Sequence, residues 1–183
     1  LFFVNGANVS IVKADIIYKL GLRHDRLAEW DDALRYYEAA VKAAPGEDYY
    51  WLFYGRGFME RAKEEQDQTR RDAYFREALR SLSEARELNP LNTDHTANLA
   101  RINRTWAEYE SDAETRRNRL VAALGLYEEA TALSPNNAQL WNEWGLVHSM
   151  MGDMDMALAK FQHSLVVDPL YEQTYLLMGE MYV

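Results

Sequence analysis

The chain has 183 residues, no cysteine, a formal net charge of −9 and a hydrophobic content of 48%. The lack of cysteine excludes disulfides and thiolate metal sites, and the acidic balance excludes a basic surface of the extent that a nucleic acid partner requires. No stretch approaches the roughly 18–20 consecutive apolar residues that cross a bilayer.

Residues 1–13 are predicted to be a linker or an extended lead-in, because small and polar residues precede the first periodic helix. These residues are Asn5, Gly6, Asn8 and Ser10. From residue 14 onward the prolines at 45, 90, 135 and 169 end successive helix pairs, since proline cannot continue the helical hydrogen bonds. The predicted array, 14–183, comprises the pairs 14–47, 48–92, 93–137 and 138–171 and a partial pair, 172–183.

Small residues recur at one position of each first helix, with spacings of 34, 45, 45 and 34 residues. They are Gly21, Gly55, Ala100, Gly145 and Gly179. The alanines at 33, 78, 123 and 157 recur in the second helices with spacings of 45, 45 and 34. Glycine and alanine allow two helices to cross closely. A fixed period of this length is typical of a solenoid of stacked helix pairs.

The second and third pairs are predicted to be longer than the others. Gly55 and Ala78 are 23 residues apart, whereas Gly21 and Ala33 are 12 apart, so eleven residues have been added between the two helices. Eleven residues make about three turns, which preserves the direction in which each helix faces. Shared between two helices, the addition predicts an extension of about 8 Å in each.

The chain resembles the tetratricopeptide repeat (TPR) family. The fourth pair carries the family's pattern at Trp141, Trp144, Gly145, Gly152, Ala157, Phe161 and Pro169, and the first pair carries it at Leu20, Gly21, Ala33, Tyr37, Ala40 and Pro45. The resemblance implies an all-α, right-handed solenoid of antiparallel helix hairpins, with the second and third hairpins elongated. It also implies a scaffold that binds a protein or peptide.

In this family the first helices line a concave groove. Carried over to this sequence, the groove residues are Tyr18, Leu22, Tyr49, Leu52, Arg56, Met59, Arg101, Arg104 and Asn142. Three arginines among aromatic residues favour an acidic peptide segment, with an anionic glycan as the alternative. Arg56 and Arg104 each have a glutamate four residues later, so ordinary ion pairs on the helix surface are the alternative role.

The sequence predicts no catalytic residue, no metal site and no cofactor. The four histidines are far apart and have no metal-binding spacing. His24 and His148 occupy the same repeat position, which predicts packed side chains inside a hairpin. There is no glycine-rich phosphate loop and no nucleophile elbow. We therefore expect that this part of the protein is not an enzyme.

A second resemblance concerns the context of the chain. The stretches 13–19, 48–56 and 90–101 look like the repeat tail of some bacterial O-antigen ligase or polymerase-type membrane proteins. This implies a soluble appendage on the extracytoplasmic side, with glycan transfer carried out by a membrane part outside this sequence. The competing hypothesis is a free-standing cytoplasmic scaffold.

The last helix is predicted to associate weakly with a second copy of the chain. The partial pair 172–183 has Leu177, Met178 and Met181 on one helix and no second helix to cover them. Burying apolar surface of this kind is favourable by about 25 cal/mol per Å².

Overall fold

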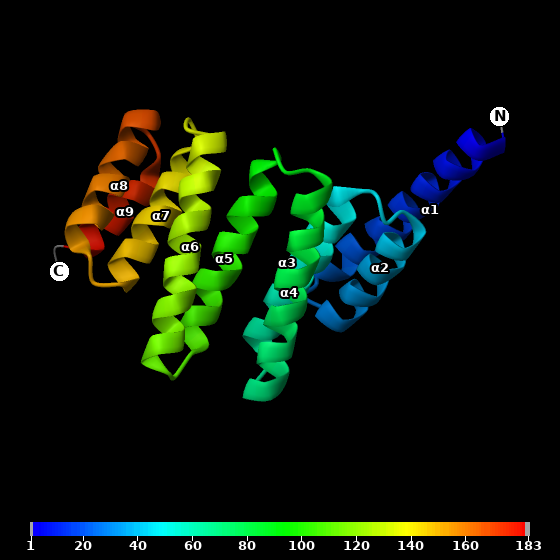
Figure 1. The fold of residues 1–183 in the computed structure, drawn as a ribbon, viewed down its shortest axis with the longest axis horizontal. Helices are drawn as coiled ribbons and strands as arrows, with labels where there is room; N and C mark the ends of the chain where they lie inside the picture. The colour runs from blue at the N-terminus through cyan, green and yellow to red at the C-terminus, as the bar shows by residue number, and fades with distance from the viewer. Residues whose placement is uncertain (1, 182–183) are drawn as a thin grey trace. The chain divides into compact units, whose positions relative to one another are not determined.

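The computed structural model describes the backbone of residues 2–181, and within this range it contains nine helices and no strand (Figure 1). The helices are α1 (Phe2–Asp25), α2 (Trp30–Ala43), α3 (Asp48–Glu64), α4 (Gln68–Leu88), α5 (Thr93–Tyr109), α6 (Ala113–Leu133), α7 (Ala138–Met150), α8 (Met154–Val167) and α9 (Glu172–Glu180). The all-α prediction is confirmed.

The first helix begins earlier than predicted. The helix α1 starts at Phe2 and includes residues 2–13 of the segment 1–13, which the sequence predicted as a linker or extended lead-in; residue 1 lies outside the described residues. Its early residues, such as Val9 and Val12, are exposed. The apolar periodicity that marks a packed helix is therefore weak there, although the helix itself continues.

The chain divides into two compact units, residues 1–95 (unit 1) and 96–183 (unit 2). In unit 1, α1 packs on α2, α2 on α3, and α3 on α4. In unit 2, α6 packs on α7, α7 on α8, and α8 on α9. None of the described helices combines the length and the apolar character that a membrane span requires.

The second and third hairpins are longer than the fourth, as predicted. The first helices α3 and α5 have 17 residues where α7 has 13, and the second helices α4 and α6 have 21 where α8 has 14. The first helix is four residues longer and the second is seven residues longer, which together account for the eleven added residues. At 1.5 Å per residue they lengthen the first helix by about 6 Å and the second by about 10 Å. The predicted equal extension of about 8 Å in each helix is therefore corrected.

Close helix crossings explain the recurring small residues. A Cβ atom built on Gly21 would lie 2.7 Å from Cε1 of Tyr37, and one on Gly145 would lie 2.5 Å from Cε1 of Phe161. Both rings are almost completely buried. Since real Cβ atoms do not approach other atoms so closely, the ring of the second helix takes the space that a larger side chain would need.

Pro45, Pro135 and Pro169, three of the four prolines that end a helix pair, each accept a hydrogen bond from an aromatic residue of the following helix. The indole Nε1 of Trp51 donates to the carbonyl oxygen of Pro45 at 2.9 Å, and Nε1 of Trp141 donates to that of Pro135 at 2.8 Å. An aromatic residue six positions after the proline therefore fixes the start of the next helix.

Candidate functional site

An aromatic cluster connects α1 and α3 in unit 1. The ring centroids of Tyr18, Tyr49 and Phe53 lie 4.8–5.1 Å from one another. Tyr18 is 3% exposed and donates its hydroxyl hydrogen to the hydroxyl oxygen of Tyr49 at 2.9 Å. Tyr49 is 47% exposed. We call the surface formed by Tyr49, Phe53 and Arg56, with the buried Tyr18 beneath it, the α1–α3 face.

The local helix geometry produces this face. Tyr49, Phe53 and Arg56 follow one another at intervals of four and three residues, which places them on one side of α3. Phe53 was not among the predicted groove residues. Its position four residues after Tyr49 is the signal that identifies it.

The buried tyrosines Tyr18 and Tyr37 are neutral. Burial, together with the hydrogen bond to Tyr49, raises the pKa of Tyr18 well above its ordinary value. Burial also raises the pKa of Tyr37, whose hydroxyl donates to Oδ2 of Asp25 at 2.7 Å. The hydroxyl groups of Tyr18 and Tyr37 beneath the α1–α3 face therefore carry no charge.

Arg56 supplies a positive charge at the edge of this face. Its Cζ atom lies 5.2 Å from the ring centroid of Phe53, within the range of a cation–π interaction. Arg56 is exposed, and no ion pair to it occurs among the described residues. The glutamate that the sequence offered as its partner, Glu60, instead pairs with Lys63 at 2.5 Å.

The remaining predicted groove residues of unit 1 contribute less surface. Leu52 is 7% exposed, so it belongs to the interior of the unit. Leu22 packs partly buried against the same core as Tyr18, and Met59 is also partly buried. The structure thus places Tyr49 and Arg56 on the surface, whereas Tyr18 and Leu52 are buried and their predicted place on a groove surface is corrected.

The two predicted arginines of unit 2 have internal partners. Nε of Arg101 donates to both carboxylate oxygens of Glu143, at 2.8 and 3.0 Å. Nη1 of Arg104 donates to Oε1 of Glu108 at 3.0 Å, which is the helix-surface pair that the sequence offered as an alternative. Both charges are therefore compensated within the unit, in contrast to that of Arg56.

Asn142 is a core residue, and its predicted place on a groove surface is corrected. It is 2% exposed, and its Oδ1 accepts a hydrogen bond from Oγ1 of Thr174 at 3.0 Å. Thr174 also contacts Oγ of Ser164 at 3.0 Å. This small polar network joins α7, α8 and α9, and α9 covers the asparagine that a groove residue would expose.

One group of described residues has the composition of a metal site. Ligand atoms of His24, Glu29 and Asp32 lie within 4.8 Å of one another. Nδ1 of His24 contacts Oε2 of Glu29 at 2.6 Å, while Asp32 pairs with Arg35. The same arrangement recurs in the fourth hairpin, where Nδ1 of His148 lies 3.3 Å from Asp153. The repetition favours a role in closing the hairpin, so the group carries no assignment to a metal.

Comparison with known proteins agrees with this architecture. Residues 18–65 match a family model described as tetratricopeptide repeat. No curated protein sequence matches the chain.

Three solved structures are similar in fold. The first is TTC0263, a thermophilic TPR protein of Thermus thermophilus, with a TM-score of 0.71 and 22% identity over 91% of this chain and 83% of that protein. A crystal structure of MamA has a TM-score of 0.63 and 20% identity over 85% and 78% of the two chains. The TPR domain of Arabidopsis OM64 has a TM-score of 0.61 and 13% identity over 77% and 98%. The chain therefore has the fold of tetratricopeptide repeat proteins, and its residues 18–65 carry the sequence pattern of that family.

Proposed function

We propose that this chain is a non-catalytic scaffold that binds a peptide segment of another protein on the α1–α3 face. The TPR fold supports the general role, since proteins of this family are typically interaction scaffolds. The particular surface is supported by one observation, the uncompensated Arg56 beside an exposed tyrosine in a molecule whose net charge is −9.

The chemistry of the face determines what it would bind. An arginine guanidinium forms two parallel hydrogen bonds with a carboxylate. Tyrosine combines a large apolar ring with a polar hydroxyl, and it loses little conformational entropy on binding. Tyr49 is already held by its hydrogen bond to Tyr18, so part of this cost is met before a partner arrives. An acidic peptide with an apolar or aromatic residue can bind both Arg56, through its carboxylate, and Tyr49, through its apolar side chain.

Selection of random peptides displayed on phage tests this proposal directly. We expect the chain to enrich acidic sequences that contain an apolar residue, with binding weakened by salt because exposed charges are screened. Arg56→Glu and Tyr49→Ala should each reduce the binding of the selected peptides at least tenfold. Arg76→Glu, an equal change of charge at an exposed position of α4, is the matched control.

Two outcomes would contradict the proposal. If Arg56→Glu and Arg76→Glu reduce binding equally, only the net charge matters. If no peptide is enriched while a sulfated or carboxylated glycan binds in an Arg56-dependent way, the partner is a glycan and the protein-binding role is wrong.

A further inference from the structure

Each long hairpin extends past a shorter neighbouring hairpin, and we call the place where the shorter hairpin ends the step. Each unit has a hollow at its step. In unit 1 a hollow of about 370 Å³ is lined by the end of α3 and by the turn between α1 and α2. In unit 2 a hollow of about 380 Å³ is lined by the beginning of α6 and by the end of α7. The eleven additional residues are the common cause of both.

The step in unit 1 is joined by polar contacts across it. Nε of Arg61, on α3, donates to Oδ1 of Asp31 at 2.8 Å. The indole Nε1 of Trp30 donates to Oε1 of Glu64, also at 2.8 Å. The long helix is thus held by an acidic residue and a tryptophan that are adjacent at the start of α2, in the short hairpin.

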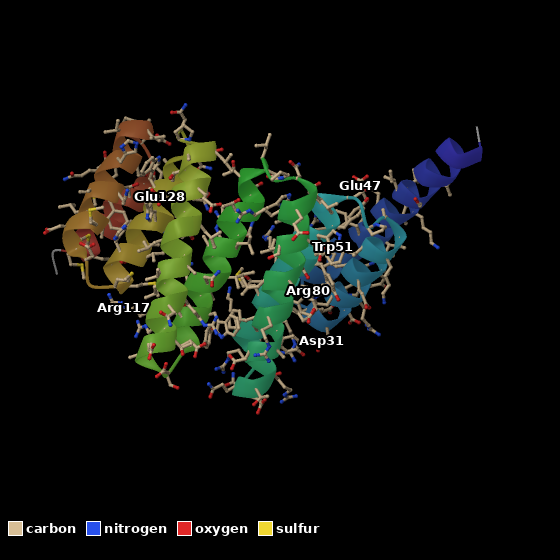
Figure 2. All side chains as sticks on the ribbon, in the orientation of Figure 1. Asp31, Glu47, Trp51, Arg80, Arg117 and Glu128 are labelled. Carbon is tan, nitrogen blue, oxygen red and sulfur yellow. The ribbon has the colours of Figure 1, made fainter. Side chains whose placement is uncertain are left out.

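In unit 2, the arginines at the step form no such hydrogen bond to the short hairpin within the described residues. Arg116 and Arg117 are exposed on the part of α6 that extends past α7, and no ion pair to either occurs in residues 9–181. Arg117 is labelled on α6 in Figure 2. Asp112 and Glu114 are near in sequence, but neither forms an ion pair with these arginines in residues 9–181, and Glu110, the acid that lines the hollow, is bound by Arg119 at 2.7 Å.

Besides the arginines, Glu110 and Ser111, apolar side chains line this hollow. Leu120 is 3% exposed, and Met150 and Met151 are partly buried. Leu120 begins the buried stripe by which α6 packs in its unit, and this stripe continues at Ala123 and Tyr127. One turn before Leu120, where α7 has ended, the same side of α6 presents arginine instead of an apolar residue.

We propose that the unit 2 step binds an acidic peptide segment that carries a tryptophan or another large apolar side chain. The occupant would supply what Asp31 and Trp30 supply in unit 1. Paired arginines bind carboxylates with defined geometry, and methionines adapt to aromatic rings of varied shape. The volume lies within the roughly 300–1,000 Å³ that is usual for binding pockets. This site is separate from the α1–α3 face and does not rest on its function.

A peptide with the sequence of residues 28–33, Ala-Glu-Trp-Asp-Asp-Ala, is the probe. It is blocked at both ends, labelled with fluorescein and titrated with the full chain by fluorescence anisotropy. We expect saturable binding that weakens as salt is added. A peptide with serine in place of tryptophan, and one with amides in place of the three acids, should each bind at least tenfold more weakly.

Variants of the chain locate the binding. Arg116→Glu combined with Arg117→Glu should weaken binding of the probe at least tenfold, and the pair Arg116→Gln with Arg117→Gln should weaken it less. Arg23→Glu combined with Arg76→Glu makes the same change of charge at exposed positions of unit 1 and should leave binding unchanged. Circular dichroism of every variant should equal that of the parent chain.

Three results would overturn the proposal. The first is probe binding that persists in both arginine double variants of the step. The second is binding lost in Arg56→Glu, which would move the probe to the α1–α3 face. The third is the absence of saturable binding at millimolar concentration of the chain.

Discussion

The carboxylate of Asp48, at the start of α3, lies 2.7 Å from Nε2 of His95, at the start of α5. A carboxylate only accepts hydrogen bonds, so Nε2 carries the proton. The same oxygen accepts hydrogen bonds from Nδ2 of Asn89 at 3.0 Å and from Nδ2 of Asn92 at 3.5 Å. One acid thereby holds the connection between α4 and α5, and His95 is completely buried.

Asp48→Asn should lower the free energy of unfolding by about 1.5–3 kcal/mol at pH 7, since it removes hydrogen bonds to a charged group. Burial alone would raise the pKa of Asp48, but the hydrogen bonds from His95, Asn89 and Asn92 outweigh it and lower the pKa below 3.8. The contribution of a carboxyl with a lowered pKa is complete above its unfolded value and disappears as the pH falls through its folded value. Urea unfolding of both proteins should show a constant difference above about pH 5 that shrinks below pH 3.8. Glu87→Gln, at an exposed position of α4, should show no such difference.

Two glycines in helices should respond to alanine with opposite signs. At Gly145 the new Cβ would lie 2.5 Å from Phe161 and 3.1 Å from the carbonyl oxygen of Ala157, so Gly145→Ala should destabilise the chain by about 1–3 kcal/mol. At Gly125, within α6, no atom lies within 4 Å of the new Cβ. Gly125→Ala should stabilise by about 0.4–1 kcal/mol. Thermal unfolding measures both, and equal effects would refute the role of Gly145 as a crossing point.

The effect of shortening the third hairpin on thermal stability should depend on the number of residues removed. Deleting 106–109 and 113–119 takes away eleven residues, keeps the loop 110–112 and gives α5 and α6 the lengths of α7 and α8. Deleting 106–109 and 113–117 takes away nine and turns the remaining stripe of α6 by about half a turn, at 3.6 residues per turn. We expect the first protein to unfold at the higher temperature. Identical melting temperatures would show that register does not govern these hairpins.

Thr174→Val should loosen α9 without changing its shape. The substitution leaves Oδ1 of Asn142 buried without its donor, which costs about 1–3 kcal/mol. Hydrogen exchange should accelerate in α9 and much less in α7. Gln173→Ala, on an exposed neighbour, is the control. Unchanged exchange in α9 would mean that apolar contacts alone hold this helix.

The architecture could be predicted from the sequence because its determinants are local and repeated. The small residues at 21, 55 and 145 meet large side chains where the spacing predicted crossings, and the additional residues of the long hairpins are helical. The division of those residues between two helices was not predicted, since the spacing from Gly55 to Ala78 alone does not show where the loop lies. Asp67 and Asp112, which cap α4 and α6, decide it.

The site was less predictable because ion pairing depends on residues distant in the sequence. Arg101 meets Glu143, 42 positions later, whereas Arg56 meets no acid in the described range. The local sequence points the other way, because Arg56 has a glutamate four residues later and Arg101 has none. Asn142 is covered by Thr174, 32 positions later. Self-association through 172–183 stays a prediction. On α9, Tyr175 and Leu176 are the exposed apolar residues, while Leu177, Met178 and Met181 are partly buried. The resemblance to O-antigen ligase tails also stays a prediction.

The length of a hairpin and the way it stacks are set by different residues in this chain. In the second hairpin, Gly55 crosses Leu82 far from the loop. The added turns have contacts of their own, such as those of the buried residues Ala62 and Phe75. In the third hairpin, Arg119 stacks on Trp106 with 3.2 Å between Cζ and the ring centroid. Selection can therefore change the surface residues of the added turns while the residues at the helix crossings stay the same. Among relatives with hairpins of the same length, sequence divergence should concentrate near the loops and spare the glycines, so that one scaffold acquires new partners without a new fold.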